Sequence, residues 1–240
     1  MKRVVEVKNF QMKFDEKTVI SDLSFEVQKG EVFGLLGANG SGKTTTIRAL
    51  LGFYRPSGGK LLIDGKPYDP EDTSIVVGYL PEERGLYRKE TVIDTMVYFG
   101  DLKGVKNPRE WSLKYLERVG LTDKVNEKIE KLSGGQQQKV QLGVTIMANP
   151  KLLILDEPTK GFDPMNRRLL MEIIDELRQG GTAVILITHY MDEVERLCDR
   201  ILLLKDGTAR AYGDVKTIRK EFGGKSLDKI FIDIYGSKDE

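Results

Sequence analysis

The strongest constraint in this sequence is a short apolar run that opens into a glycine-rich loop. Val32–Leu36 is an apolar run, and residues 37–44 read Gly-Ala-Asn-Gly-Ser-Gly-Lys-Thr. A helix-like run, 45–51, follows at once. Strand, loop, Lys-Thr and helix in this order match the phosphate-binding loop G-x-x-x-x-G-K-[ST]. The alternative is a glycine-rich turn before an ordinary helix, and the matching order of all four parts makes it the weaker one.

Each part of this loop has a chemical role toward a bound polyphosphate. Glycines let successive backbone N–H groups curl into an anion-binding nest, and the N-terminus of the following helix adds partial positive charge. We expect Lys43 to neutralise the β- and γ-phosphates and the Thr44 hydroxyl to bind Mg²⁺. The loop residues predicted to contact the nucleotide are Gly37, Ala38, Asn39, Gly40, Ser41, Gly42, Lys43, Thr44 and Thr45.

A second apolar run, Leu152–Leu155, ends in two carboxylates, Asp156 and Glu157. Such a run is typical of a strand buried on both faces, and its last residue lies at the sheet edge where open α/β sheets bind ligands. We expect Asp156 to hold Mg²⁺, directly or through water. Glu157 lies one residue further on and therefore points elsewhere, toward the attacking water. A strand merely closed by polar residues is the alternative, which the nearby phosphate loop weakens.

The same stretch of chain predicts the fold. Ala183–Ile187 is another short apolar run, and a helix lies between it and Leu152–Leu155. Asp163 can cap that helix, Pro164 suits its first position, and Gly180 can end it. Strand, helix and strand form a βαβ unit. We therefore expect an α/β fold with a mostly parallel sheet and helices on both faces.

Two segments differ from this core. Apolar and polar residues alternate within 1–30, and an Asp-Gly turn signal lies within 58–77, which together predict an N-terminal antiparallel β subdomain. Residues 82–132 have helical spacing and no buried-strand run, which predicts a helical lobe inserted into the sheet domain. The whole chain, 1–240, is expected to be a single domain.

Composition excludes several functions. The 38 basic and 37 acidic side chains leave a net charge of +1, which gives no overall attraction to nucleic acid. One histidine and one cysteine cannot form a structural zinc site. No apolar run approaches the roughly 20 residues of a membrane span, so a membrane role must work through another chain. Cys198 lies on an apolar helical face and is predicted to be core. Trp111 and Tyr115 are predicted to pack the helical lobe, with partner contact as the alternative.

Two further elements are ambiguous from the residues alone. Residues 132–136 read Leu-Ser-Gly-Gly-Gln and precede a helix, so they suit either phosphate binding or a plain N-cap turn. His189 follows the run Ala183–Ile187 closely. A lone histidine is more often structural, but this position favours a functional role.

Taken with the phosphate loop and Leu-Leu-Ile-Leu-Asp-Glu-Pro, the Leu-Ser-Gly-Gly-Gln segment makes the sequence resemble the ATP-binding cassette (ABC) family. The resemblance covers nearly the whole chain and implies a P-loop NTPase fold, with ATP and Mg²⁺ as ligands. It also implies a head-to-tail dimer with ATP at the interface. In that dimer Ser133, Gly135 and Gln136 of one chain contact the γ-phosphate held by the other.

The resemblance assigns further roles. Phe14 falls where the family places an aromatic residue under the adenine ring. Asp163 matches the aspartate of the D-loop, and His189 matches the switch histidine. The implied catalytic residues are Lys43, Glu157 and His189, where Glu157 polarises the water and His189 helps hold the γ-phosphate geometry.

One departure concerns the metal site. The family usually has glutamine where this sequence has Glu82. We expect the Glu82 carboxylate to join Thr44 and Asp156 as a metal ligand, because a carboxylate binds a hard cation more strongly than an amide does. The stretch 82–87 resembles exporters whose membrane subunit is a separate chain. The D-loop also carries Lys160 and a phenylalanine where serine and leucine are more usual.

The function implied is the cytoplasmic ATPase subunit of an ABC transporter, peripheral on the inner face of the membrane. It would drive transport, with export favoured, through a separate membrane-spanning permease, as a homodimer or paired cassette and without a nucleic-acid partner. The alternative is a soluble, non-transport ABC ATPase. Those of translation usually carry two cassettes, whereas this chain has one. Those of DNA repair carry a long coiled coil between the phosphate loop and the signature, whereas only 87 residues separate Thr44 from Leu132 here. A degenerate, non-enzymatic cassette is disfavoured by the intact Glu157.

Overall fold

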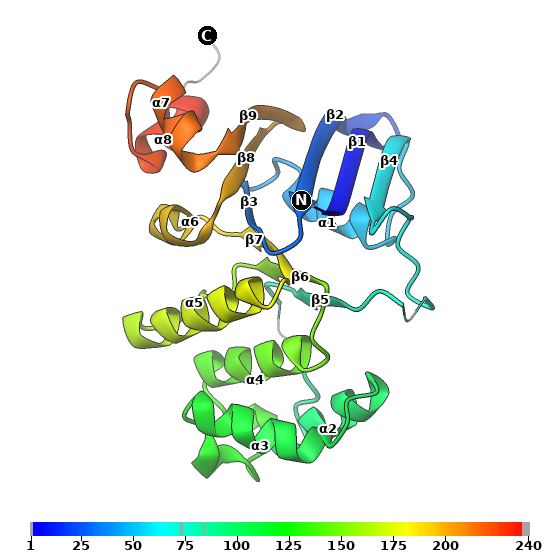
Figure 1. The fold of residues 1–240 in the computed structure, drawn as a ribbon, viewed down its shortest axis with the longest axis vertical. Helices are drawn as coiled ribbons and strands as arrows, with labels where there is room; N and C mark the ends of the chain where they lie inside the picture. Colours follow the sequence, from blue (N-terminus) through cyan, green and yellow to red (C-terminus); the bar gives the residue numbers. More distant parts are fainter. Residues whose placement is uncertain (1, 73, 84, 237–240) are drawn as a thin grey trace.

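The computed structural model describes residues 2–72, 74–83 and 85–236, which form one mixed α/β unit (Figure 1). Arg84, in the exporter-like stretch, and residues 237–240, at the end of the predicted domain, lie outside this description. The strands are β1 (Arg3–Phe14), β2 (Lys17–Gln28), β3 (Val32–Leu36), β4 (Gly58–Ile63), β5 (Val77–Leu80), β6 (Leu152–Asp156), β7 (Ala183–Ile187), β8 (Arg200–Lys205) and β9 (Thr208–Asp214). The helices are α1 (Lys43–Leu50), α2 (Val92–Leu102), α3 (Pro108–Arg118), α4 (Gly134–Ile146), α5 (Pro164–Gln179), α6 (Met191–Leu197), α7 (Val215–Glu221) and α8 (Leu227–Gly236), with two 3₁₀ turns, η1 (Thr122–Lys124) and η2 (Ile129–Lys131).

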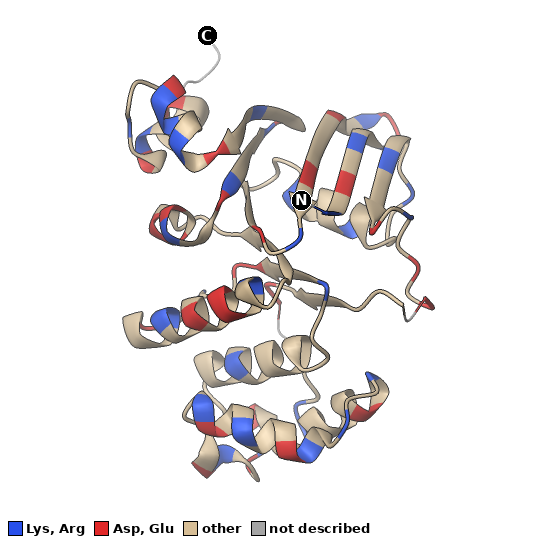
Figure 2. Ribbon diagram, in the orientation of Figure 1, with Lys and Arg blue, Asp and Glu red and all other residues tan. Residues whose placement is uncertain are grey.

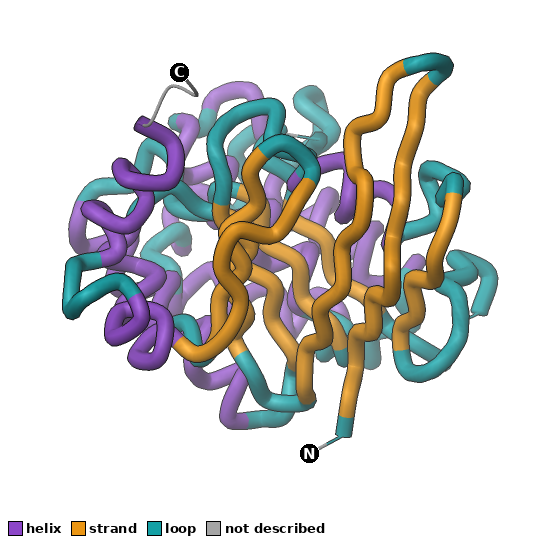
Figure 3. The backbone as a smooth tube through the Cα atoms, turned by 90° about the horizontal axis from the view of Figure 1, so that it is seen from above, coloured by secondary structure: helices purple, strands orange, loops and turns teal. Residues whose placement is uncertain are grey.

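The strands form one sheet in the order β4-β1-β2-β9-β8-β3-β7-β6-β5 over the described residues. From β8 to β5 every pairing is parallel, whereas β1 pairs antiparallel with both β2 and β4. Between β2 and β9 the register has a single pair, Asp22 with Thr208. Figure 3 shows the long antiparallel strands standing to one side of the shorter parallel ones. The predicted fold class, a mostly parallel sheet with an antiparallel N-terminal part, is confirmed.

The buried strands supply two separate hydrophobic cores. In β6, Leu152 and Ile154 belong to the core that includes Ile47 of α1, whereas Leu153 and Leu155 belong to the core shared with α4, α5 and α6. Successive side chains of a strand point to opposite faces, so each face must be covered. Helices therefore pack on both faces of the sheet, as the apolar runs predicted.

Helix α5 begins as predicted. The Asp163 carboxylate accepts a hydrogen bond from the backbone N–H of Asn166 at 2.8 Å, and Pro164 occupies the first turn. The helix ends at Gly180, but the left-handed residue is the next one, Gly181, with φ at 94°. The extra glycine lets the chain turn directly into β7.

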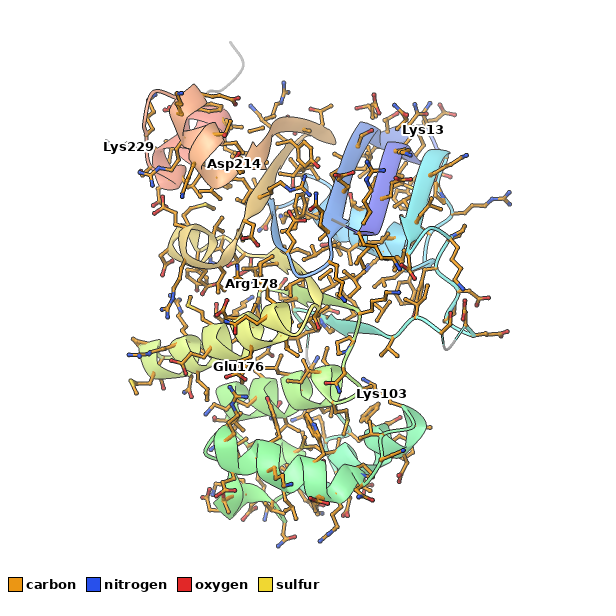
Figure 4. The ribbon with its side chains drawn as sticks, in the orientation of Figure 1. Lys13, Lys103, Glu176, Arg178, Asp214 and Lys229 are labelled. Carbon is orange, nitrogen blue, oxygen red and sulfur yellow. The ribbon has the colours of Figure 1, made fainter. Side chains whose placement is uncertain are left out.

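Helices α2 and α3 lie within the predicted lobe, 82–132, and pack beside α4 at the end of the molecule opposite α7 and α8 (Figure 1). Figure 4 labels Lys103 at the end of α2, where its ammonium group donates to the Val144 carbonyl of α4 at 2.6 Å. The subdomain boundaries given above stay a prediction.

The aromatic pair of α3 packs as expected. Tyr115 is buried and donates its hydroxyl to the Lys139 carbonyl at 2.8 Å, and Trp111 stacks on it with ring centroids 5.2 Å apart. A Cβ at Gly143 would overlap the Tyr115 ring, so that glycine allows α3 to approach α4. Leu113 lies three residues before the buried Leu116 in α3 but is 41% exposed. Three residues turn a helix by about 300°, which is about 60° short of a full turn. Residues spaced by repeated steps of three therefore move away from the buried side of the helix.

The remaining global predictions concern Cys198 and charge. Cys198 is buried, and a Cβ at Gly34 would lie 3.1 Å from its sulfur. The prediction that Cys198 belongs to the hydrophobic core is therefore confirmed. Figure 2 shows acidic and basic residues interspersed along most elements. Within the described parts of the chain, no helix is both long enough and apolar enough to cross a bilayer.

Candidate functional site

The loop 37–44 joins β3 to α1 and leaves the start of that helix open. Gly40 and Gly42 have φ angles of 80° and 110°, which side chains rarely allow. Gly42 also occupies the N-cap of α1, where it has no side chain to satisfy the first N–H groups. Those donors are therefore available to an anionic ligand.

Lys43 lies within this loop. Its ammonium group donates to the carbonyls of Gly37 at 2.8 Å and Ala38 at 3.1 Å. Burial lowers the pKa of Lys43, while Asp156 and Glu157 act to raise it. The lysine is thus held beside two acids in a partly desolvated position, where a phosphate would be a stronger partner than a carbonyl.

Asp156, at the end of β6, is 7% exposed. Burial, with smaller contributions from the charges of Glu157 and Glu82, raises its pKa to about 6. Like charges at one site make ionisation costly until a cation arrives. The environment of Asp156 therefore favours either protonation of its carboxylate or binding of a cation to it.

Glu157 adopts a left-handed backbone conformation, with φ at 49°, and its N–H donates to the Ile187 carbonyl at 2.8 Å. The Oε2 atom lies 2.8 Å from Nδ1 of His189, but it accepts no hydrogen bond within the described residues. A left-handed non-glycine residue costs about 1–3 kcal/mol and is concentrated at functional sites. Two predicted catalytic residues, from the ends of β6 and β7, are therefore brought together.

Further predicted residues line one cavity of about 550 Å³. Thr44, Asp156 and Glu82 all line it, together with Tyr54. Phe14 is exposed and contacts the Tyr54 ring edge-on, with centroids 5.2 Å apart. The oxygen donors fit Mg²⁺, which prefers carboxylates, phosphates and water. In residues 2–72, 74–83 and 85–236 no group of three or more acids, histidines or cysteines is arranged to hold a metal ion.

Glu82 has a partner that the sequence did not indicate. Its carboxylate forms an ion pair with Lys160 at 2.6 Å, and both side chains are exposed. Two of the three residues that depart from the family pattern therefore contact each other. Glu82 also borders a second cavity with Gln138 and Gly161, so it lies between the phosphate loop and α4.

The start of α4 is closed by its own side chains. Ser133 accepts from the Gln136 N–H at 3.3 Å, and the Gln136 side chain accepts from the Ser133 N–H at 2.8 Å. Gly135 lies beside the Phe162 ring, since a Cβ there would be 3.6 Å from it. Among the described residues no hydrogen bond or ion pair joins this turn, or Asp163, to the phosphate loop. One chain thus brings together most of the site but not these four predicted residues.

Comparison with known proteins identifies this set of elements. A family profile described as "ABC transporter" matches residues 20–160. The chain belongs to the ABC transporter family. An uncharacterized ABC transporter ATP-binding protein of Methanocaldococcus jannaschii is 46% identical over 220 residues, which cover 91% of this chain and 80% of that protein.

Other relatives carry more specific names. The linearmycin resistance ATP-binding protein LnrL of Bacillus subtilis is 34% identical, covering 95% of this cassette and 75% of its own length. The Nod factor export ATP-binding protein I of Burkholderia lata is 36% identical, covering 87% and 70%. A solved ATP-binding subunit of an ABC transporter superimposes with a TM-score of 0.89 at 29% identity, covering 96% of this chain and 99% of that one. The predicted resemblance is confirmed: the chain is an ATP-binding subunit of this family.

The cassette also contains a buried acid that sequence reasoning missed. Glu193, 1% exposed, accepts hydrogen bonds from the hydroxyls of Thr159 at 2.6 Å and Thr188 at 3.2 Å. These threonines belong to the segments that carry Glu157 and His189. The signal was available, because Glu193 lies one helical turn before Leu197 and so shares its buried face. A buried acid needs hydrogen-bond partners, and here these partners connect the segment that carries Glu157 to the segment that carries His189.

Proposed function

We propose that this cassette hydrolyses ATP with Mg²⁺ as a head-to-tail dimer bound to a separate membrane permease, on the cytoplasmic, inner face of the membrane. The observation that carries the proposal is the pairing of Glu157 with His189 beside Lys43 and Asp156. No nucleic acid is involved. Export is the favoured direction.

Hydrolysis needs positioning and charge stabilisation, because water attacks the γ-phosphorus in line with the departing ADP oxygen. Glu157 takes a proton from that water as the new O–P bond forms and the bond to the β-phosphate oxygen breaks. His189 lies beside the Glu157 carboxylate and helps hold the γ-phosphate geometry. Lys43 exchanges its two carbonyl partners for phosphate oxygens. Thr44 and Asp156, with Glu82, would hold Mg²⁺, which neutralises phosphate charge when bound.

A dimer supplies what one chain lacks. Ser133, Gly135 and Gln136 form no hydrogen bond or ion pair with their own phosphate loop among the described residues, so we assign them to the nucleotide of the partner chain. Asp163 and Phe14 complete the interface and the adenine contact. Two chains related in this way form two equivalent sites.

The transport assignment rests on the family and on the names of two relatives. One is named for Nod factor export and one for linearmycin resistance, and both are called ATP-binding proteins. With no membrane-crossing helix in the described residues, the pathway is assigned to a permease chain. The exporter-like stretch 82–87, of which Arg84 is not described, favours the outward direction.

The decisive experiment replaces Glu157 by glutamine. If Glu157 is the base, Glu157→Gln keeps ATP binding but slows turnover by about 10²-fold or more. ATP with Mg²⁺ then traps the dimer, which gel filtration detects. Glu172→Gln is a matched control, because Glu172 is a surface acid paired with Arg168 on α5. A Glu157→Gln protein that hydrolyses at the wild-type rate removes Glu157 from this role.

The head-to-tail arrangement has its own test. Lys43→Ala and Ser133→Arg each inactivate both sites of a homodimer. Mixed heterodimers place both substitutions in one site and leave the other intact, so ATPase activity should return. Confirmed heterodimers without recovered activity contradict this arrangement.

A further inference from the structure

Glu193 of α6 is a buried carboxylate that the proposed steps of hydrolysis do not use. Its Oε1 atom accepts from the Thr159 hydroxyl at 2.6 Å, and its Oε2 atom accepts from the Thr188 hydroxyl at 3.2 Å. Thr159 lies two residues after Glu157, and Thr188 directly precedes His189. The two oxygens of one carboxylate therefore hold two different segments, each of which carries a predicted catalytic residue.

The segment that carries Glu157 has a backbone that needs support. Its left-handed φ of 49° is costly for a residue with a side chain, and such a conformation persists only where the surroundings fix it. The Glu157 N–H donates to the Ile187 carbonyl at 2.8 Å, and the Glu157 carbonyl accepts from the Lys160 N–H at 3.1 Å. Within the same turn, the Thr159 hydroxyl adds a side-chain bond to Glu193. Loss of that bond would loosen the turn that directs the Glu157 carboxylate.

The segment that carries His189 is held through a second hydroxyl. The His189 side chain is 57% exposed, so burial does not fix its direction. The Thr188 hydroxyl, which donates to Glu193, also accepts from the Tyr190 N–H at 3.1 Å. This bond closes a turn whose middle residue is His189, and the ring centroids of His189 and Tyr190 lie 4.1 Å apart. Glu193 thus acts on the histidine through the orientation of the Thr188 hydroxyl.

Arg167 of α5 provides a positive charge beside the buried acid, where α5 packs next to α6 (Figure 1). Its Nε atom lies 3.8 Å from Oε1 of Glu193, and its guanidinium group lies 4.0 Å from the centroid of the Tyr190 ring. Burial raises the pKa of Glu193, whereas the two threonine hydroxyls and Arg167 act to lower it. The network needs a carboxylate at this position, because an amide has only one acceptor oxygen for the two hydroxyl donors.

We propose that Glu193 is a positioning residue for ATP hydrolysis, which fixes the segments of Glu157 and His189 relative to each other through the hydroxyls of Thr159 and Thr188. The inference rests on the proposed function, in which Glu157 is the base and His189 helps hold the γ-phosphate geometry. Glu193 acts on turnover rather than on ATP binding, because neither threonine belongs to the phosphate loop. A displacement of about 1 Å in a catalytic group can cost about 10²-fold in rate.

The first test replaces the carboxylate by an amide. Glu193→Gln keeps the shape of the side chain but loses one acceptor, so we expect kcat to fall about tenfold. The Kd for a non-hydrolysable ATP analogue with Mg²⁺ should stay within about twofold. Asp192→Asn is the matched control, because it makes the same change one residue earlier in α6, where the exposed Asp192 also lies 4.0 Å from Arg167. It should hydrolyse ATP at the wild-type rate.

A pair of substitutions at Thr188 tests the network from its other side, even if Glu193→Gln folds poorly. Thr188→Val removes the hydroxyl and should slow turnover about as much as Glu193→Gln, whereas Thr188→Ser keeps the hydroxyl and should restore most of that rate. The double variant of Glu193→Gln with Thr188→Val should be little slower than either single variant, because both changes break one network. Additive losses, or a serine variant as slow as the valine variant, contradict the positioning role.

The remaining outcomes separate this inference from the proposed function. A wild-type kcat for Glu193→Gln, or an equal loss in Asp192→Asn, overturns the role of Glu193. An increase in Kd that accounts for the whole loss of kcat/KM overturns it as well. Glu157→Gln is measured in parallel. If that variant is slowed while Glu193→Gln is not, only the positioning role is wrong, whereas a wild-type rate for Glu157→Gln contradicts the proposed hydrolysis and the positioning role together.

Discussion

The N-termini of α1 and α4 are both predicted to meet phosphate, yet they are built differently. The first begins at Gly42, which has no side chain to cap it. The second begins at Ser133, where a reciprocal capping box with Gln136 satisfies two backbone donors. One end therefore leaves its donors to a ligand, whereas the other is satisfied without one.

This difference indicates an order of events. The open end of α1, with Lys43 beside it, suits the first and tighter contact with a triphosphate. The closed end of α4 keeps its shape without nucleotide and still has the Ser133 hydroxyl hydrogen to offer, because a hydroxyl can accept and donate together. A partner chain can thus add a second contact to nucleotide already bound, without refolding the turn.

The largest expected effect is at the α1 end. Lys43→Met removes the cation nearest the open donors and should lower kcat/KM for ATP by about 10²–10³-fold. Lys103→Met is the control, since that ammonium group also donates to a carbonyl but belongs to the helical lobe. Similar losses in both variants, measured by steady-state ATPase assays, would show that general destabilisation rather than phosphate contact is responsible.

The acid opposite α1 predicts a pH effect. The pKa of Asp156 rises from 3.8 to about 6, so the folded chain holds this proton more tightly than the unfolded chain does. The associated stability is full below pH 4 and is lost as pH rises through 6. Without nucleotide or metal, Asp156→Asn should therefore gain about 2 kcal/mol over the wild type between pH 4.5 and 7.5. Urea unfolding at the two pH values measures this gap, and a constant gap contradicts the raised pKa.

A substitution at the N-terminus of α4 should lower the free energy of unfolding and also weaken ATP-dependent dimerisation. Ser133→Ala removes an N-cap, which costs about 1 kcal/mol of unfolding free energy. Thr91→Ala removes the comparable cap of α2, where Thr91 accepts from the Asp94 N–H at 3.1 Å. We expect matched losses in urea unfolding, but weaker ATP-dependent dimerisation only for Ser133→Ala. If gel filtration finds equal dimerisation in both, Ser133 is a structural cap and nothing more.

The smallest effect concerns Glu82, which lies between the two ends. Glu82→Gln should raise the Mg²⁺ concentration needed for half-maximal ATPase by about threefold, as expected for an exposed carboxylate. Lys160→Ala frees Glu82 from its ion pair and should shift the Mg²⁺ requirement in the opposite direction. Superimposable titrations for all three proteins would remove Glu82 from the metal site.

The sequence was sufficient to predict the elements that depend on short patterns of neighbouring residues. Buried strands such as β6, the cap of α5 by Asp163 and the phosphate loop all follow from short patterns and were found as expected. Strand β5 was not singled out, because Val77–Leu80 is short and contains glycine and tyrosine. Its identity depends on pairing with β6, which is a long-range event.

The residues of the candidate site also fall into two groups, those that short motifs predict and those that depend on tertiary contacts. Lys43, Asp156 and Glu157 could be assigned from motifs, because strand ends place them at one edge. The ion pair of Glu82 with Lys160 and the hydrogen bonds of the buried Glu193 join segments far apart in sequence. Such contacts depend on tertiary packing, which no periodicity in one chain encodes.

The buried thiol beneath Gly34 has a practical consequence. The sequence holds one cysteine, and burial raises the pKa of its thiol well above the ordinary value. Alkylating reagents react with exposed thiolates, so the native chain should stay unlabelled at neutral pH. A cysteine introduced on the surface of α4 or α8 can then carry a dye or spin label without prior removal of Cys198. Distances between the two chains of an ATP-bound dimer become measurable in an otherwise unaltered protein.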